Sequence, residues 1–147
     1  MSQPDEKVDL LSSVGYLLKQ ASSALHASME SVLRPLGMTI THYSCLELLH
    51  QRPGLSNSEL ARGAFVTRQS MNVLLHSLER DGLVIRSEVA TTGRALPTEL
   101  TAKGREQLAV ASAAVRKVED RMKSGLDGGQ QEQFKRMLAQ CIASLRQ

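Results

Sequence analysis

The segment from Thr67 to Val84, TRQSMNVLLHSLERDGLV, places long hydrogen-bonding side chains between residues that are typical of a core. Its polar members are Arg68, Gln69, Ser70, Asn72 and His76, and its apolar members are Leu74, Leu75, Leu78, Leu83 and Val84. Arginine can pair with the edge of guanine, and glutamine or asparagine with the edge of adenine, through two hydrogen bonds each. The segment alone is equally compatible with an ordinary solvated helix face, so the elements around it must decide between the two interpretations.

Other kinds of chemistry have little support in the sequence. We find no glycine-rich phosphate loop, no paired-carboxylate site and no catalytic triad. The four histidines, at positions 26, 42, 50 and 76, are scattered, and no third ligand joins His42 and His50. We therefore expect no catalytic residue, no metal and no cofactor, and we do not expect an enzyme.

The two cysteines, Cys45 and Cys141, are far apart and lack metal-ligand spacing. Cys45 lies near a predicted helix start, three residues after His42, and a lowered thiol pKa there could make it a redox switch. Both cysteines also lie beside apolar residues, and we favour their interpretation as small core residues. We expect both thiols to be reduced, which is typical of a cytoplasmic protein.

Length and charge are compatible with one domain and a nucleic-acid partner. The chain has 147 residues, a formal net charge of +3 and a sequence pI near 9.1. No apolar run approaches the roughly 18 residues that span a bilayer. The N-terminal residues, MSQPDEKVDL, are polar and do not resemble a signal peptide.

Four helices are predicted before the end of the polar segment. Apolar residues three and four apart predict a long helix over 8–33, which ends at the RPLG sequence. A second helix is expected from Thr41, with Tyr43, Leu46 and Leu49 facing the core. Ser56 and Glu59 have the spacing of a capping box at the start of a third. Thr67 can cap a fourth, which is expected to run to Asp81 and to pack through Val73, Leu74 and Leu78.

The remaining chain predicts a hairpin and two helices. LVIRSEV and LPTEL are the expected strands, joined by the loop ATTGRA. Thr101 begins a helix with an apolar stripe formed by Leu108, Ala111, Val115, Val118 and Met122. After the break at Gly125 to Gly129, Asp127 to Gln130 can cap a last helix that carries Phe134, Leu138, Cys141 and Leu145.

Three short helices followed by a hairpin are the order of a winged helix-turn-helix. We expect a mainly α fold with a small β-hairpin wing, in which 38–101 form the DNA-binding lobe. The terminal helices, 8–34 and 102–147, have apolar stripes too long for so small a domain to cover, so a two-fold homodimer is the simplest arrangement. In this fold the fourth helix would enter the major groove of DNA.

The chain resembles the MarR family of bacterial transcription regulators over nearly its whole length, and two stretches carry the resemblance. They are LSNSELARGAFVTRQSMNVLLHSLERDGLVIR, residues 55–86, and GRALPTELTAKG, residues 93–104. The LExxGLVxR element occurs as Leu78, Glu79, Gly82, Leu83, Val84 and Arg86, and the closing LTxxG as Leu100, Thr101 and Gly104. The resemblance implies a ligand-responsive repressor that binds a pseudo-palindromic operator as a homodimer.

The polar segment and the resemblance together give a set of expected DNA-binding residues. They are Ser56, Ser58, Thr67, Arg68, Gln69, Ser70, Asn72, His76, Arg86 and Arg94. By resemblance, Arg94 would enter the minor groove from the wing. His76 could contact phosphate or nothing, and Arg86 is expected to have a structural or phosphate-binding role. The alternative is a winged-helix module that binds only proteins.

The resemblance also implies an effector crevice between the dimerisation helices and the DNA-binding lobe. Tyr16, Met38, His42 and Tyr43 could line it and accept a small aromatic or phenolic ligand, although for any single one of them we favour an ordinary half-buried residue. Two positions depart from the family pattern. Thr92 replaces the usual acidic partner of Arg94, which could loosen the wing, and Thr98 replaces the usual valine.

Overall fold

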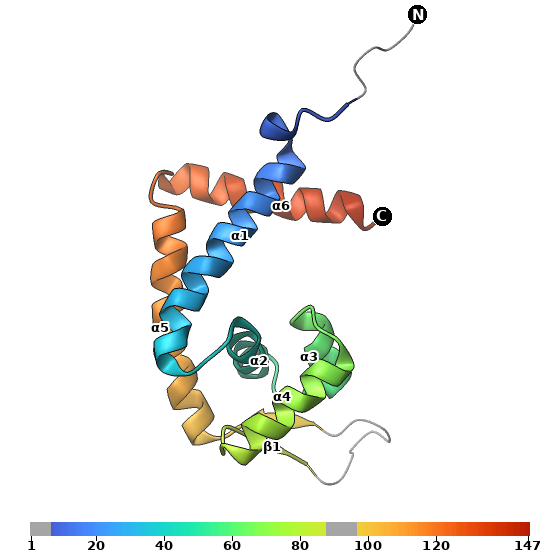
Figure 1. Cartoon of the computed structure of the whole chain (residues 1–147), viewed down its shortest axis with the longest axis vertical. Coiled ribbons are helices and arrows are strands. Elements are labelled where there is room, and N and C mark those ends of the chain that lie inside the picture. The colour runs from blue at the N-terminus through green and yellow to red at the C-terminus, as the bar shows by residue number, and fades with distance from the viewer. Residues whose placement is uncertain (1–6, 88–96) are drawn as a thin grey trace, which may run out of the picture.

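The computed structural model describes residues 7–87 and 97–147, which form helices and one short hairpin (Figure 1). In chain order the elements are η1 (Leu10–Ser12), α1 (Val14–Leu33), η2 (Arg34–Leu36), α2 (Ile40–Gln51), α3 (Asn57–Gly63), α4 (Arg68–Arg80), β1 (Val84–Arg86), β2 (Thr98–Leu100), α5 (Ala102–Met122) and α6 (Gly128–Leu145). The mainly α fold with a small hairpin is therefore confirmed. No described helix is both long and apolar enough to cross a membrane.

Side-chain caps fix where most of these helices begin. Thr67 accepts a hydrogen bond from the Ser70 backbone N–H at the start of α4, and Thr39 does the same for α2. Capping boxes open α3, with Ser56 and Glu59, and α6, with Asp127 and Gln130. Each cap satisfies backbone N–H groups that lack a partner within the helix. The predicted caps of α3, α4 and α6 are confirmed.

The first helix begins later than the apolar pattern predicts. α1 starts at Val14, and Ser13 before it is extended, with ψ of 129°. The Ser12 hydroxyl bonds to the Asp9 carbonyl, and Val8 and Leu11 are exposed. Serine side chains that bond to nearby backbone compete with helix formation, and Val8 and Leu11 are not packed against any described residue closely enough to oppose this competition. The expected start at residue 8 is therefore wrong.

A compact core joins α2, α3, α4 and the hairpin at one end of the molecule (Figure 1). On α4 the buried residues are Met71, Leu75 and Leu78, at steps of four and three. Val73 is 66% exposed, so its predicted packing is wrong. It lies about 200° around the helix from Met71, since each residue turns the helix by about 100°.

The hairpin pairs β1 with β2 antiparallel, with Val84 opposite Leu100 and Arg86 opposite Thr98. A further bridge from Leu55 to Thr98 ties it to the segment before α3. Gly82, between α4 and β1, has a φ of +76°, the left-handed conformation predicted for it. Thr92 and Arg94, at the expected tip of the wing, lie outside the described residues.

The terminal helices form the other end, where α1 packs along α5 and crosses α6 (Figure 1). Leu108, Ala111 and Val118 of the predicted α5 stripe are buried, whereas Met122 is exposed. No residue of α6 is buried in the single chain, and Cys141 is exposed. The prediction that Cys141 is a core residue is therefore wrong for the isolated chain.

Candidate DNA-binding surface and effector crevice

The N-terminal half of α4 presents a polar face to solvent. Arg68, Gln69, Asn72 and His76 are all exposed, on the side of the helix away from its buried stripe. The short turn after α3 and the Thr67 cap set where this face begins. The arrangement matches a helix that binds base edges with its exposed side chains while its apolar face holds it to the lobe.

Three of the predicted DNA-binding residues also have structural roles. The Thr67 hydroxyl caps α4 by accepting a hydrogen bond from the Ser70 N–H. It also donates a hydrogen bond to the Ser70 hydroxyl, at 3.0 Å. Ser56 belongs to the capping box of α3, and its neighbour Ser58 is half-buried on the same helix. Their contacts with DNA remain predictions.

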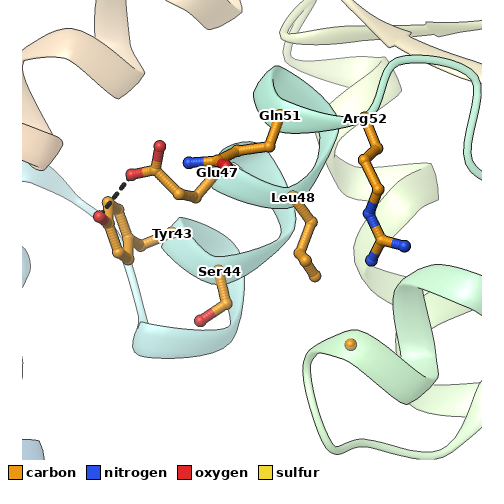
Figure 2. A pocket seen from close by; sticks show the side chains of 7 residues that line it. Tyr43, Ser44, Glu47, Leu48, Gln51 and Arg52 are labelled. Atoms are coloured by element: carbon orange, nitrogen blue, oxygen red, sulfur yellow. Dashed lines mark hydrogen bonds between the residues drawn. The ribbon is translucent and has the colours of Figure 1, made fainter. Parts of the chain in front are cut away.

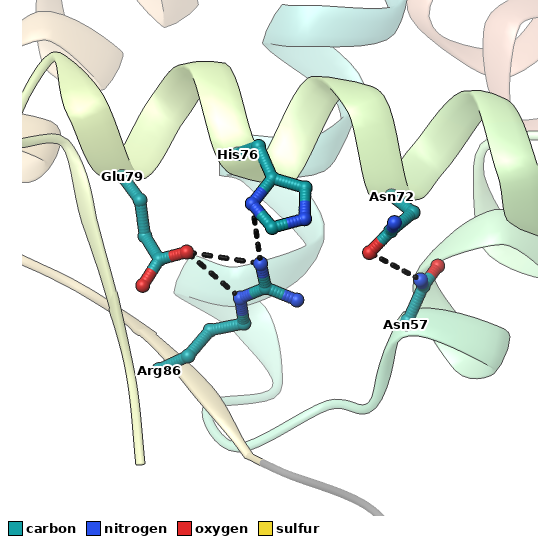
Figure 3. A network of polar contacts seen from close by, with 5 residues as sticks. All are labelled: Asn57, Asn72, His76, Glu79 and Arg86. Carbon is teal, nitrogen blue, oxygen red and sulfur yellow. Dashed lines mark hydrogen bonds and ion pairs between the residues drawn. The ribbon is translucent and has the colours of Figure 1, made fainter. Parts of the chain in front are cut away.

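Side chains from two other elements contact the polar face of α4 (Figure 3). Asn57, on α3, donates a hydrogen bond from Nδ2 to Asn72 Oδ1 at 3.4 Å. Arg86, on β1, forms an ion pair with Glu79 at 2.9 Å, and the same Nη2 atom lies 3.3 Å from His76 Nδ1. The sequence analysis missed Asn57 and Glu79. Glu79 could have been found from the LExxGLVxR element, which contains both members of the ion pair.

Two of the expected effector residues, Met38 and Tyr43, line different cavities among the described residues. Met38 is 6% exposed and lines a cavity of about 320 Å³ with Glu106 and Val110. Tyr43 lines a different cavity of about 500 Å³, formed by α2 and by Gly63 at the end of α3. Tyr16 is half-buried on α1, as is His42 on α2. A shared effector crevice therefore remains a prediction.

The cavity at Tyr43 has a polar lining, shown in Figure 2: Tyr43, Ser44, Glu47, Leu48, Gln51, Arg52 and Gly63. The Tyr43 hydroxyl donates a hydrogen bond to Glu47 Oε2 at 2.5 Å. Burial and this carboxylate together raise the pKa of Tyr43 to about 12. Arg52 places a cation at this cavity, and hydrogen bonds with Ser56 together with this charge lower the pKa of Glu59.

Burial also shifts the pKa of two further groups on α2, His42 and Cys45. It lowers the pKa of His42 from 6.5, against the opposing effect of Asp81. It raises the pKa of Cys45, which is fully buried, to about 12. A thiol with so high a pKa is protonated at neutral pH and reacts slowly with oxidants. Burial therefore argues against Cys45 as a redox switch. The described residues also contain no group of three side chains that could hold a metal ion.

Comparison with known proteins identifies the family of the chain. The MarR family model matches residues 36–95. The HTH-type transcriptional repressor Rv2887 of Mycobacterium tuberculosis is 45% identical over 125 residues, which are 85% of this chain and 90% of the relative. This chain belongs to the MarR family.

Solved structures of the MarR family protein Rv2887 from M. tuberculosis share the fold. Its complex with DNA has a TM-score of 0.75 and 42% identity, with 88% of this chain and 98% of that chain covered. Its complex with salicylic acid has a TM-score of 0.73 and 43% identity, with 88% of this chain and 96% of that chain covered. The MarR family resemblance on residues 55–86 and 93–104 is thus confirmed.

Proposed function

We propose that this MarR-family protein is a transcriptional repressor that binds operator DNA as a homodimer. The observation that carries the proposal is the division of α4 into a buried stripe, with Met71, Leu75 and Leu78, and an exposed polar face, with Gln69 and Asn72. The DNA complex of a relative 42% identical to this chain supports it. Its role is binding rather than catalysis, and it would act in the cytoplasm.

The exposed apolar side chains of α1 and α6 support the homodimer. Val14, Leu17 and Leu18 of α1 line a groove of about 390 Å³ together with Phe134, Met137, Leu138 and Cys141 of α6. An apolar groove of this kind is costly to leave in water, and a second copy of the same helices would cover it. The boundaries 8–34, 38–101 and 102–147 remain the proposed division between dimerisation helices and DNA-binding lobe.

The proposed effector is a small aromatic acid. The salicylic acid complex of Rv2887 supports this class of ligand. Tyr16, Met38, His42 and Tyr43 remain the proposed contacts. Salicylate should weaken binding to operator DNA, which a titration of the protein–DNA complex would measure.

Selection of bound sites from random DNA tests the DNA-binding proposal. We expect an inverted repeat with half-sites roughly 10 base pairs apart, because each subunit presents one α4 helix. Affinity should fall steeply with salt, since contacts with phosphates release counterions. Direct repeats, or binding without a salt dependence, would contradict the proposal and favour a module that binds proteins.

A further inference from the structure

A cluster of three side chains fixes one edge of the His76 ring. Arg86 extends from β1 toward α4, and its side chain is only 17% exposed. Its Nε and Nη2 atoms donate to the same oxygen of Glu79, at 3.0 and 2.9 Å. Nη2 also lies 3.3 Å from His76 Nδ1. The ion pair with Glu79 thus holds a guanidinium N–H against one particular nitrogen of the imidazole.

This contact determines where the His76 ring carries its proton. An arginine side chain has only donors and remains charged, so the nitrogen that faces it must supply a lone pair. A neutral imidazole with a lone pair on Nδ1 carries its proton on Nε2. The opposite tautomer would point an N–H at another N–H. The cluster therefore favours the tautomer of His76 that has its donor at Nε2.

The donor lies on the face that is proposed to meet DNA. Figure 3 shows the second ring nitrogen of His76 on the side of the ring toward Asn72, with no dashed line to Arg86. His76 is exposed, and it follows Asn72 by four residues, which places the two on one face of the helix. No described residue forms a hydrogen bond with Nε2. The N–H is thus free for a ligand at this face.

We propose that His76 is a specificity-determining residue, which donates from Nε2 to an acceptor on the major-groove edge of a base. Arg86 and Glu79 are positioning residues that select the tautomer. Guanine, adenine and thymine all present an acceptor in the major groove, whereas cytosine presents an amino donor. His76 should therefore exclude cytosine at one position of each half-site. The inference rests on the proposed function, because it assigns the chemistry of one contact with operator DNA.

The tautomer can be measured without DNA. Long-range proton–nitrogen correlation spectra of the full-length protein distinguish protonated from unprotonated ring nitrogens. We expect Nε2 to be protonated and Nδ1 unprotonated in the wild type and in Arg86→Lys, which keeps a donor at this place. Arg86→Met should give a mixture of tautomers. Protonation of Nδ1 in the wild type, or no change in Arg86→Met, would overturn the role of the cluster.

Two replacements of His76 separate the two edges of the ring. His76→Gln retains a donor near the place of Nε2, and His76→Asn retains an acceptor near that of Nδ1. Binding is measured against the selected operator, the operator with cytosine at each position, and scrambled DNA. We expect His76→Asn to lose about tenfold discrimination against cytosine at one position of each half-site. His76→Gln should retain most of it, and binding to scrambled DNA should change little.

Other outcomes would overturn the assignment. Equal loss of discrimination in both variants would show that the Nε2 donor is not what matters. A similar loss of affinity for operator and scrambled DNA would indicate a phosphate contact rather than a base contact. Failure of the wild type to bind any selected DNA would refute the proposed function, and with it the base contact, while the spectra would still report whether Arg86 sets the tautomer.

Discussion

Three buried polar atoms lack a hydrogen-bond partner within the described residues: His42 Nε2, Asn57 Oδ1 and Thr98 Oγ1. Each such group has lost its hydrogen bonds to water, at a cost of roughly 1–3 kcal/mol. Asn57 retains a bond through its other amide atom, to Asn72. The unpaired atoms of Thr98 and His42 have different consequences for stability, because the threonine hydroxyl carries no charge, whereas the histidine ring can take up a proton.

Replacement of Thr98 by valine should stabilise the protein. Thr98 is fully buried in β2, and valine has nearly the same shape without the unpaired hydroxyl. We expect the free energy of unfolding to rise by about 1 kcal/mol. Denaturant unfolding at a fixed protein concentration measures the change.

Thr101→Val is the matched control, because its hydroxyl is fully used. Thr101 Oγ1 accepts a hydrogen bond from the Gly104 N–H at 3.0 Å and donates to the Gly82 carbonyl at 2.6 Å. The same substitution there should lower the free energy of unfolding by about 1–2 kcal/mol. A stabilisation at both positions, or at neither, would contradict the hydrogen-bonding explanation.

His42 should make stability depend on pH. Burial lowers its pKa in the folded protein below 6.5, so the unfolded chain binds a proton first as the pH falls. The contribution of this residue to stability is complete above pH 6.5 and decreases below it. We expect wild-type stability to fall more than that of His42→Gln between about pH 7.5 and pH 5. Parallel pH profiles of the two proteins would refute the assignment.

Among the elements, the start of α5 is the most tightly constrained junction. Thr101 N–H bonds to the Leu83 carbonyl, which holds the helix start against the beginning of the hairpin. Gly104 lies against the same carbonyl, and a Cβ there would overlap with its oxygen. This close approach explains why the last position of the LTxxG element is glycine: any side chain there would collide with the Leu83 carbonyl.

Gly104→Ala should therefore destabilise the protein strongly. The clash is with backbone rather than with a flexible side chain, so α5 or the hairpin must move. We expect a loss of at least about 2–3 kcal/mol in the free energy of unfolding. Gly125→Ala is the control, because a Cβ there meets no atom within 4 Å. Similar stabilities for the two variants would show that the junction can adjust.

Local sequence signals predicted the elements well and their partners poorly. The caps at Ser56, Thr67 and Asp127 were predictable because a helix start depends on residues three positions apart. The exposure of Val73 was not, since several neighbouring apolar residues on α4 made the direction of the buried stripe ambiguous. The prediction of where α1 starts was wrong because the apolar residues before Val14 remain exposed among the described residues.

The candidate site shows the same limit. The exposed polar face of α4 followed from the spacing of its residues, because helix geometry alone decides which side chains share a face. The contacts of Asn57 and Arg86 with this face cross between elements, and no periodicity within α4 reveals them. The four proposed effector residues come from different places in the chain, and their convergence depends on tertiary and quaternary arrangement that local pattern does not determine.

At the scale of the whole molecule, the apolar residues divide between a buried core and an exposed surface. One buried core holds the lobe of α2, α3, α4 and the hairpin and extends to Leu33 of α1 and to Leu108 and Ala111 of α5, whereas the far ends of α1 and α6 leave large side chains in water. Leu17 is 50% exposed in the groove that these helices form, and Met137 across from it is 52% exposed. Association of two copies would therefore bury these apolar side chains, at the end of the molecule opposite to the proposed DNA-binding surface.

Leu17→Asp should weaken the dimer far more than it affects the isolated lobe. Burial of a leucine side chain contributes about 1.5–3 kcal/mol, and each dimer would lose two of them as well as burying two charges. We expect the dissociation constant measured by sedimentation equilibrium to rise by at least about a hundredfold. Ile85→Asp is the control, since Ile85 is 60% exposed on β1, outside the groove.

If the two variants have the wild-type association state, the groove is not the dimer interface. If both dissociate equally, added charge rather than loss of the groove is the cause. Dissociation of Leu17→Asp alone would assign the interface to α1 and α6, and its affinity for an inverted repeat should then fall because two linked α4 helices no longer bind together.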